Sequence, residues 1–175
     1  MGQYYKAVTL GDNKKTIKQW LSSYDFNNGA KLMEHSWSEN EFVKSFERLI
    51  VNNPQRVVWA GDYADECKGL KTNIYDRCKD NNKVPKDEVY PVGVLVSRYI
   101  INHSKKQFVD KTKVPDNDGW IIHPLPLLTA EGNGRGGGDY RGESPIIGTW
   151  ARDLISVGRE IPEGYTELIF DLVEN

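Results

Sequence analysis

SENEFVKSFERLIVNNPQRVVWAG, residues 38–61, places a helix signal directly before a strand signal. Apolar side chains recur in its first half at the spacing of one helical face, at Phe42, Phe46, Leu49 and Ile50. This spacing predicts a helix over residues 39–51. Ser38 and Glu41 have the spacing of a capping box at the start of that helix, and the Asn-Asn-Pro of residues 52–54 ends it.

Residues 56–60 are β-branched and aromatic, and they predict a strand that Gly61 ends. Further strand signals lie on both sides of it, at residues 3–10, 30–37, 91–101, 107–111, 120–128, 149–157 and 165–172. A second helix is expected over residues 70–79, and residues 16–23 fit a short helix as well as an exposed strand. The sum predicts an α+β protein with a mainly antiparallel sheet of about seven strands and two helices, in a single globular domain over residues 1–175.

The composition is that of a folded chain without a strong electrostatic bias. Aromatic residues make up 11% of the chain and the net charge is −2, whereas disorder is typical of chains with few aromatics and a high net charge. This balance gives no general attraction to polyanions, so nucleic acid is not expected as a partner. No apolar run has the length of a signal-peptide core or a membrane span, so we expect a soluble, cytoplasmic protein with no membrane partner.

The most unusual stretch is the loop EGNGRGGGDYRG, residues 131–142, which holds six glycines. Glycine loses more conformational freedom on folding than any other residue, so a loop of this kind indicates positive φ angles or the close approach of another group. Gly132, Gly134 and Gly137 match the dinucleotide-binding pattern. That pattern requires a strand before it and a helix after it, and neither is expected here.

Successive backbone amides in this glycine-rich loop can form an anion-binding concavity, to which Arg135 and Arg141 add positive charge. We therefore expect the loop to bind a small anionic, nucleotide-like ligand or a protein partner. The candidate ligand-binding residues are Gly134, Arg135, Gly136, Gly137, Gly138, Asp139, Tyr140 and Arg141, together with Trp59 and Asp62. The alternative is a loop that only joins two strands, with its arginines paired to nearby carboxylates.

Three carboxylates, Asp62, Asp65 and Glu66, follow the strand at residues 56–60. They could bind a divalent cation or act as an acid–base pair. The structural alternative, which we favour, makes Asp62 a turn residue and Asp65 a helix N-cap. No known metal-binding spacing is present, so neither a metal site nor a cofactor is predicted.

The histidines and cysteines show no ligand spacing and no catalytic signature. His123 precedes a proline in an apolar stretch and is expected to be a hydrogen-bonded structural imidazole, whereas His103 is expected to be solvated at a hairpin tip. Cys67 and Cys78 are about three turns apart if the segment between them is helical, which is too far to pair. No serine lies in a nucleophile elbow, so catalytic residues are not assigned.

Three stretches of the sequence are distinctive: MGQYYK at residues 1–6, VWAGDYAD at 58–65 and LTAEGNGRGGGDY at 128–140, which continues to GTWARD at 148–153. Together they resemble a family of small proteins met in bacterial and phage genomes. The resemblance covers most of the chain, but the family has no assigned activity, so it supplies no catalytic residues. Its phage setting implies an accessory or counter-defence role.

Three functions follow from these observations. The first is a non-enzymatic binding protein that uses the glycine-rich loop. The second is an enzyme that acts on a nucleotide or phosphorylated substrate, with Asp62, Asp65 or Glu66 as metal or acid–base residues. The third is a virion or structural component. The first is favoured because the sequence shows neither a nucleophile–base pair nor a strong metal motif.

Overall fold

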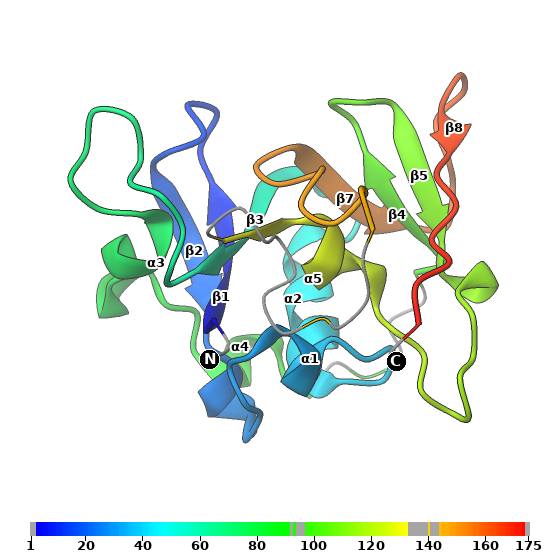
Figure 1. The fold of residues 1–175 in the computed structure, drawn as a ribbon, viewed down its shortest axis with the longest axis horizontal. Coiled ribbons are helices and arrows are strands. Elements are labelled where there is room, and N and C mark those ends of the chain that lie inside the picture. The colour runs from blue at the N-terminus through cyan, green and yellow to red at the C-terminus, as the bar shows by residue number, and fades with distance from the viewer. Residues whose placement is uncertain (1–2, 92, 94–96, 133–139, 141–143, 174–175) are drawn as a thin grey trace.

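The computed structural model describes residues 3–91, 93, 97–132, 140 and 144–173 (Figure 1). These residues form one sheet of eight mainly antiparallel strands together with five α-helices, and α2 is the only one of these helices with more than five residues. This arrangement confirms the predicted α+β class. The same residues contain no helix of the length and apolarity that a membrane crossing requires.

The strands are β1 (Tyr5–Leu10), β2 (Ile17–Leu21), β3 (Gln55–Gly61), β4 (Tyr99–Asn102), β5 (Gln107–Asp110), β6 (Ala130–Glu131), β7 (Leu154–Gly158) and β8 (Thr166–Glu167). The α-helices are α1 (Leu32–His35), α2 (Glu41–Ile50), α3 (Ile74–Arg77), α4 (Lys86–Val89) and α5 (Pro124–Leu128). Three short 3-10 helices are η1 (Ser23–Phe26), η2 (Asp80–Asn82) and η3 (Lys111–Lys113).

The sheet has the strand order β2-β1-β3-β7-β4-β5-β8. β1 lies antiparallel between β2 and β3. β3 then changes partner along its length, because Gln55 and Arg56 pair antiparallel with β7, whereas Trp59 and Ala60 pair in parallel with β6. The predicted hairpin is confirmed as β4–β5, with β7 antiparallel beside β4 and the short β8 parallel beside β5.

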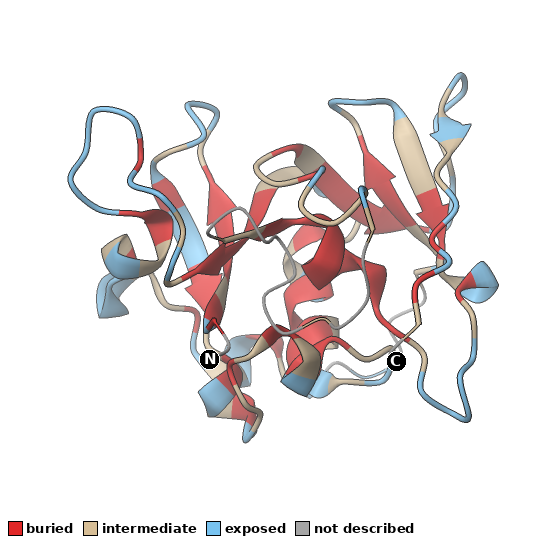
Figure 2. Cartoon of the chain, in the orientation of Figure 1, coloured by how far each residue is buried: buried red, intermediate tan, exposed pale blue. Residues whose placement is uncertain are grey.

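Both faces of β3 are covered, because its four successive apolar residues from Val57 to Ala60 are all buried. Alternate residues of β3 point to opposite faces, so Val57 and Trp59 belong to the main core and Val58 and Ala60 to a second, smaller cluster. α2 packs against the main-core face, and its inward side chains are fully buried (Figures 1 and 2). The exposed loops lie at the periphery of the sheet in Figure 2.

The predicted helix of residues 39–51 is confirmed as α2, but its start differs. Asn40 is the N-cap, and its side-chain Oδ1 accepts hydrogen bonds from the backbone N–H groups of Phe42 and Val43. The predicted capping box of Ser38 and Glu41 is therefore wrong. Both Ser and Asn are good N-caps, and Asn40 lies two residues after Ser38.

Two predicted strands are helices instead. Residues 120–128 contain α5, which begins at Pro124. A proline fits the first position of a helix because the N–H group that it lacks would have no acceptor within the helix there. Residues 30–37 contain α1, a single turn too short to show helical periodicity. In both cases the prediction took an apolar run for a strand, an ambiguity that short apolar runs carry.

Other elements are shorter than predicted. The second helix is reduced from residues 70–79 to the single turn α3, with Leu70 exposed. Strands expected over 149–157 and 165–172 are the shorter β7 and β8, and the strand expected over 91–101 begins only at Tyr99, with residues 92 and 94–96 outside the described residues. Residues 16–23, which fitted either state, form β2.

Candidate functional site

Most of the glycine-rich loop lies outside the described residues. This applies to Gly134, Arg135, Gly136, Gly137, Gly138, Asp139 and Arg141. Tyr140 is described, and its hydroxyl donates a hydrogen bond to the backbone carbonyl of Val173 at 3.0 Å. Whether this loop binds a ligand therefore stays a prediction.

The base of that loop is tied to the sheet by Arg152. Its guanidinium forms a two-point ion pair with Glu131, at 2.5 and 2.8 Å, and donates to the backbone carbonyl of Lys14 at 3.0 Å. Arg152 has a φ angle of 67°, a left-handed conformation that costs free energy in a non-glycine residue. The geometry thus fixes the point at which the loop leaves β6.

The other two predicted ligand-binding residues do not meet in a pocket. Trp59 is fully buried, and its indole N–H donates to Nε2 of His35 at 2.9 Å. Asp62 follows β3 and accepts a hydrogen bond from the backbone N–H of Tyr4 at 3.0 Å. Asp65 does not cap a helix, because the N-cap of α3 is Asn73.

A metal centre is not formed by the described part of the chain. No group of three or more histidine, cysteine, aspartate or glutamate side chains there has the arrangement that holds a metal ion. Cys67 and Cys78 are both buried and not paired with each other, although the helix expected between them is only the single turn α3.

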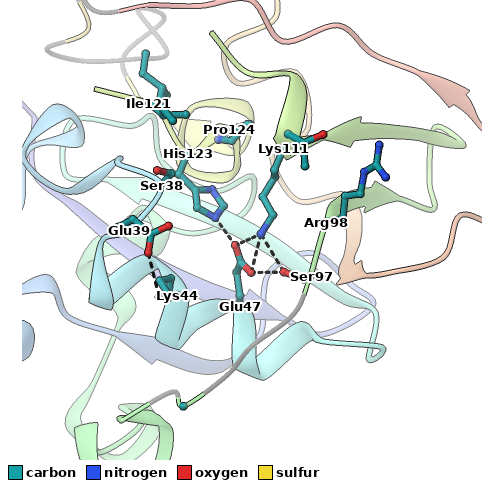
Figure 3. Close-up of a pocket in the computed structure, with 13 residues that line it drawn as sticks. Ser38, Glu39, Lys44, Glu47, Ser97, Arg98, Lys111, Ile121, His123 and Pro124 are labelled. Carbon is teal, nitrogen blue, oxygen red and sulfur yellow. Dashed lines mark hydrogen bonds and ion pairs between the residues drawn. The ribbon is translucent and has the colours of Figure 1, made fainter. Parts of the chain in front are cut away.

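A pocket of about 500 Å³ opens between α2, the start of β4, η3 and residues 121–124 (Figure 3). None of the predicted site residues lines it. Its floor is a cluster of four polar side chains, Glu47, Ser97, Lys111 and His123, which we call the Glu47 cluster (Figure 3). The four come from four separate segments of the chain, so only the folded protein brings them together.

Glu47 is at the centre of this cluster, and its side chain is only 2% exposed. The Lys111 ammonium donates to both carboxylate oxygens, at 2.9 and 3.1 Å, and the Ser97 hydroxyl donates to Oε2 at 2.6 Å. Nε2 of His123 contacts Oε1. Each oxygen therefore accepts two hydrogen bonds, which is the full capacity of a carboxylate.

His123 is held in one tautomer by its two neighbours. Its Nδ1 accepts a hydrogen bond from the backbone N–H of Leu125 at 3.2 Å, so the ring proton lies on Nε2 and is donated to Glu47. Complete burial lowers the pKa of His123, which favours this neutral form. The prediction that His123 is a hydrogen-bonded structural imidazole is confirmed, although it caps a helix and does not lie in a strand.

The Glu47 carboxyl is ionised. Burial alone raises the pKa of a carboxyl, but the His123 ring, the Lys111 ammonium and the Ser97 hydroxyl outweigh burial here and lower the pKa of Glu47 to about 2. The floor of the pocket is thus a closed unit of one negative and one positive charge, with its hydrogen bonds satisfied internally.

The rim of the pocket carries cationic groups with spare capacity. Arg98 is 51% exposed and uses Nε and Nη2 to hold Asp110, at 3.1 and 2.8 Å. Lys44 is paired with Glu39 at 3.3 Å, but the Glu39 side chain is 87% exposed and its pairing is weak. An incoming acceptor group can therefore be met by Lys44 and Arg98 at the rim.

The remaining histidines serve the fold. His35 donates from Nδ1 to the Gly29 carbonyl at 2.9 Å and accepts from Trp59. Its pKa is lowered to about 4, because burial outweighs the hydrogen bond to Gly29. His103 was expected to be solvated, but it is half-buried between the hydroxyls of Ser156 and Tyr165, at 2.8 and 2.9 Å.

Sequence reasoning missed the Glu47 cluster. The one signal for it was the position of Glu47, four residues after Val43 and three before Ile50, which places a carboxylate on the apolar face of α2. Its partners, Ser97 and Lys111, lie far along the chain and carried no motif.

Comparisons of the chain with protein families, with curated proteins and with solved structures gave no match.

Proposed function

We propose that this protein is a non-enzymatic binding protein that holds a small anionic molecule, of the size of a mononucleotide, in the pocket above the Glu47 cluster. The observation that carries the proposal is a saturated, buried charge network at the floor of a pocket whose rim presents Lys44 and Arg98. Buried charges of this kind are costly to maintain and concentrate at functional sites. The volume of about 500 Å³ is typical of small-ligand pockets.

Binding is favoured over proton-transfer catalysis by the state of the floor. A general base works best when its pKa lies near the working pH, and Glu47 has a pKa of about 2. His123 has both ring nitrogens engaged, so neither is placed to exchange a proton with a ligand. The side chains at the floor of the pocket thus hold fixed charges and are not placed to transfer a proton.

The proposal can be tested by titrating the protein with AMP and with adenosine, its uncharged counterpart, while the melting temperature is recorded. AMP should raise the melting temperature and adenosine should not, because only AMP brings the anionic group. Arg98→Gln and Lys44→Gln should each remove most of the AMP effect. Lys71→Gln, an exposed lysine remote from the pocket in the sequence, is the matched control and should leave it unchanged.

An AMP effect that survives in both rim variants would place the ligand elsewhere, for example on the glycine-rich loop. In that case Arg135→Ala should remove it. Equal effects of AMP and adenosine would reject charge recognition altogether. No effect of either AMP or inorganic phosphate would reject the anionic ligand.

The wider setting of this function stays a prediction. A cytoplasmic location, a phage accessory or counter-defence role and a virion role are expectations from the sequence. The enzymatic alternative at Asp62, Asp65 and Glu66 is also open, and Asp62→Asn tests it by activity on phosphorylated substrates.

A further inference from the structure

We infer that the surface around Trp120 is a docking site for an arginine-bearing segment of a partner protein. This inference is independent of the pocket above the Glu47 cluster. It starts from an aromatic notch of about 340 Å³ that Met33, Trp37, Asn117 and Trp120 line. Trp120 is 60% exposed, an unusual state for the largest apolar side chain.

Trp120 is exposed but firmly held. Its backbone N–H and carbonyl both bond to Asn117, at 3.0 and 3.2 Å, and close a two-residue turn through Asp118 and Gly119. Both central residues have positive φ, 53° and 86°, as a type I′ turn requires. The side-chain Oδ1 of Asp116 accepts the Gly119 N–H at 2.6 Å and braces the turn further.

The indole of Trp120 is also supported from one side. The Trp37 ring meets it edge to face, with ring centroids 5.1 Å apart, and Trp37 is itself fixed by a hydrogen bond from its indole N–H to the Met33 carbonyl at 3.1 Å. Little conformational entropy of the Trp120 side chain would therefore be lost when a partner stacks on it. Rigid tryptophans of this kind are typical of interface hot spots.

Charge identifies the partner. The turn sequence VPDNDGWI, residues 114–121, contains two carboxylates within four residues of Trp120 and no basic residue. Asp116 and Asp118 are both exposed, and Asp116 uses one oxygen within the turn and leaves the other for a ligand. A guanidinium group can interact with both features, because its plane stacks on the face of an indole while its N–H groups pair with carboxylates.

The notch and the pocket lie on opposite faces of a short ribbon. Residues 36–38 and 121–123 pair antiparallel, with Trp37 opposite Ile122. Side chains alternate along such a ribbon, so Trp37 and Trp120 point to one face while Ser38 and His123 point to the other. Occupancy of the two sites can therefore be measured separately.

The test is an NMR titration of the Trp120 indole N–H signal with the peptide acetyl-Gly-Arg-Gly-Arg-Gly-amide. The signal should shift and saturate, and Trp120→Ala should abolish binding while the backbone spectrum stays folded. The double variant Asp116→Asn, Asp118→Asn should weaken binding about tenfold. Two controls should bind as the parent protein does: Tyr24→Ala, which removes an equally exposed aromatic elsewhere, and Arg98→Gln in the other pocket.

Three results would overturn the inference. The matched peptide with norleucine in place of arginine would bind equally well if the notch recognised only apolar groups. A shift with glucose but not with the arginine peptide would make the notch a sugar site. Absence of any shift with the arginine peptide, or binding that survives in Trp120→Ala, would reject the docking site itself.

Discussion

Glu47 shows what one residue contributes when its partners are distant in sequence. Its carboxylate joins α2 to η3 through Lys111 and to the start of α5 through His123. Removal of one member of a buried pair leaves an uncompensated charge or donor, and the cost of this exceeds the net value of the interaction.

We therefore expect Glu47→Ala to lower the free energy of unfolding by about 3–5 kcal/mol in urea denaturation. Glu39→Ala is the matched control, since Glu39 forms an ion pair at the rim of the same pocket but is 87% exposed. It should change the free energy of unfolding by no more than about 0.5 kcal/mol. Similar values for the two variants would show that burial does not govern the Glu47 cluster.

His35 predicts a pH dependence of stability. The folded state resists protonation of this imidazole until pH falls to about 4, whereas the unfolded chain takes up the proton near pH 6.5. The unfolded state thus binds more protons between these values, and stability falls as the pH drops from about 6.5 to about 4, by roughly 3 kcal/mol from this residue. His35→Gln should flatten the dependence measured by urea denaturation at pH 7, 5.5 and 4.5. An unchanged slope would contradict the assignment.

Glu47 extends the same trend to lower pH. Its folded pKa of about 2 lies below the ordinary carboxyl value, so its contribution is present at neutral pH and is lost as the pH falls through that range. Both groups therefore make acid destabilising.

At the scale of elements, local sequence specifies the body of α2 but not the residue at which the helix begins. The apolar spacing of the helix is a property of neighbouring residues and predicted its body correctly. Its N-cap is decided by which side chain meets the first free amides, and here that is Asn40.

Asn40→Ala should therefore lower the free energy of unfolding by about 1 kcal/mol, as loss of an N-cap does. Ser38→Ala, at the N-cap that the sequence predicted, should have a clearly smaller effect. Thermal unfolding of the two variants side by side checks this, and the reverse order would favour the capping box at Ser38.

The elements that were predicted correctly are those whose signal is contained in one segment. β3 is a run of β-branched and aromatic residues, and the β4–β5 hairpin has two such runs around a short polar turn. α5 was missed because the apolar run of residues 120–128 was taken for a strand, although Pro124 begins a helix within it. The Glu47 cluster was missed because its members share no segment, and only the tertiary fold supplies their proximity.

At the scale of the whole molecule, the strands of the sheet differ in how much free energy is needed to open them. β1 pairs with β2 and β3 along its length and is buried on both faces, whereas β8 is a two-residue edge strand. Amide exchange follows the cost of the opening that exposes each group.

Native-state hydrogen exchange should therefore be slowest for the paired amides of β1 and β3, such as those of Val8 and Val58, and limited by global unfolding. The Leu168 amide, which bonds to the Phe108 carbonyl beside β8, should exchange faster by several orders of magnitude. Equal rates would mean that the sheet opens as one unit.

The change of partner along β3 has a consequence for how the chain folds. β1 and β2 pair across a short turn, as do β4 and β5, whereas the pairing of β3 with β7 closes a loop over more than half the chain. Closure of a long loop lowers the entropy of the chain before the stabilising contacts between its ends have formed. Two ribbons can thus form early and independently, and their joining at Gln55 and Arg56 becomes the event that sets the pace of folding.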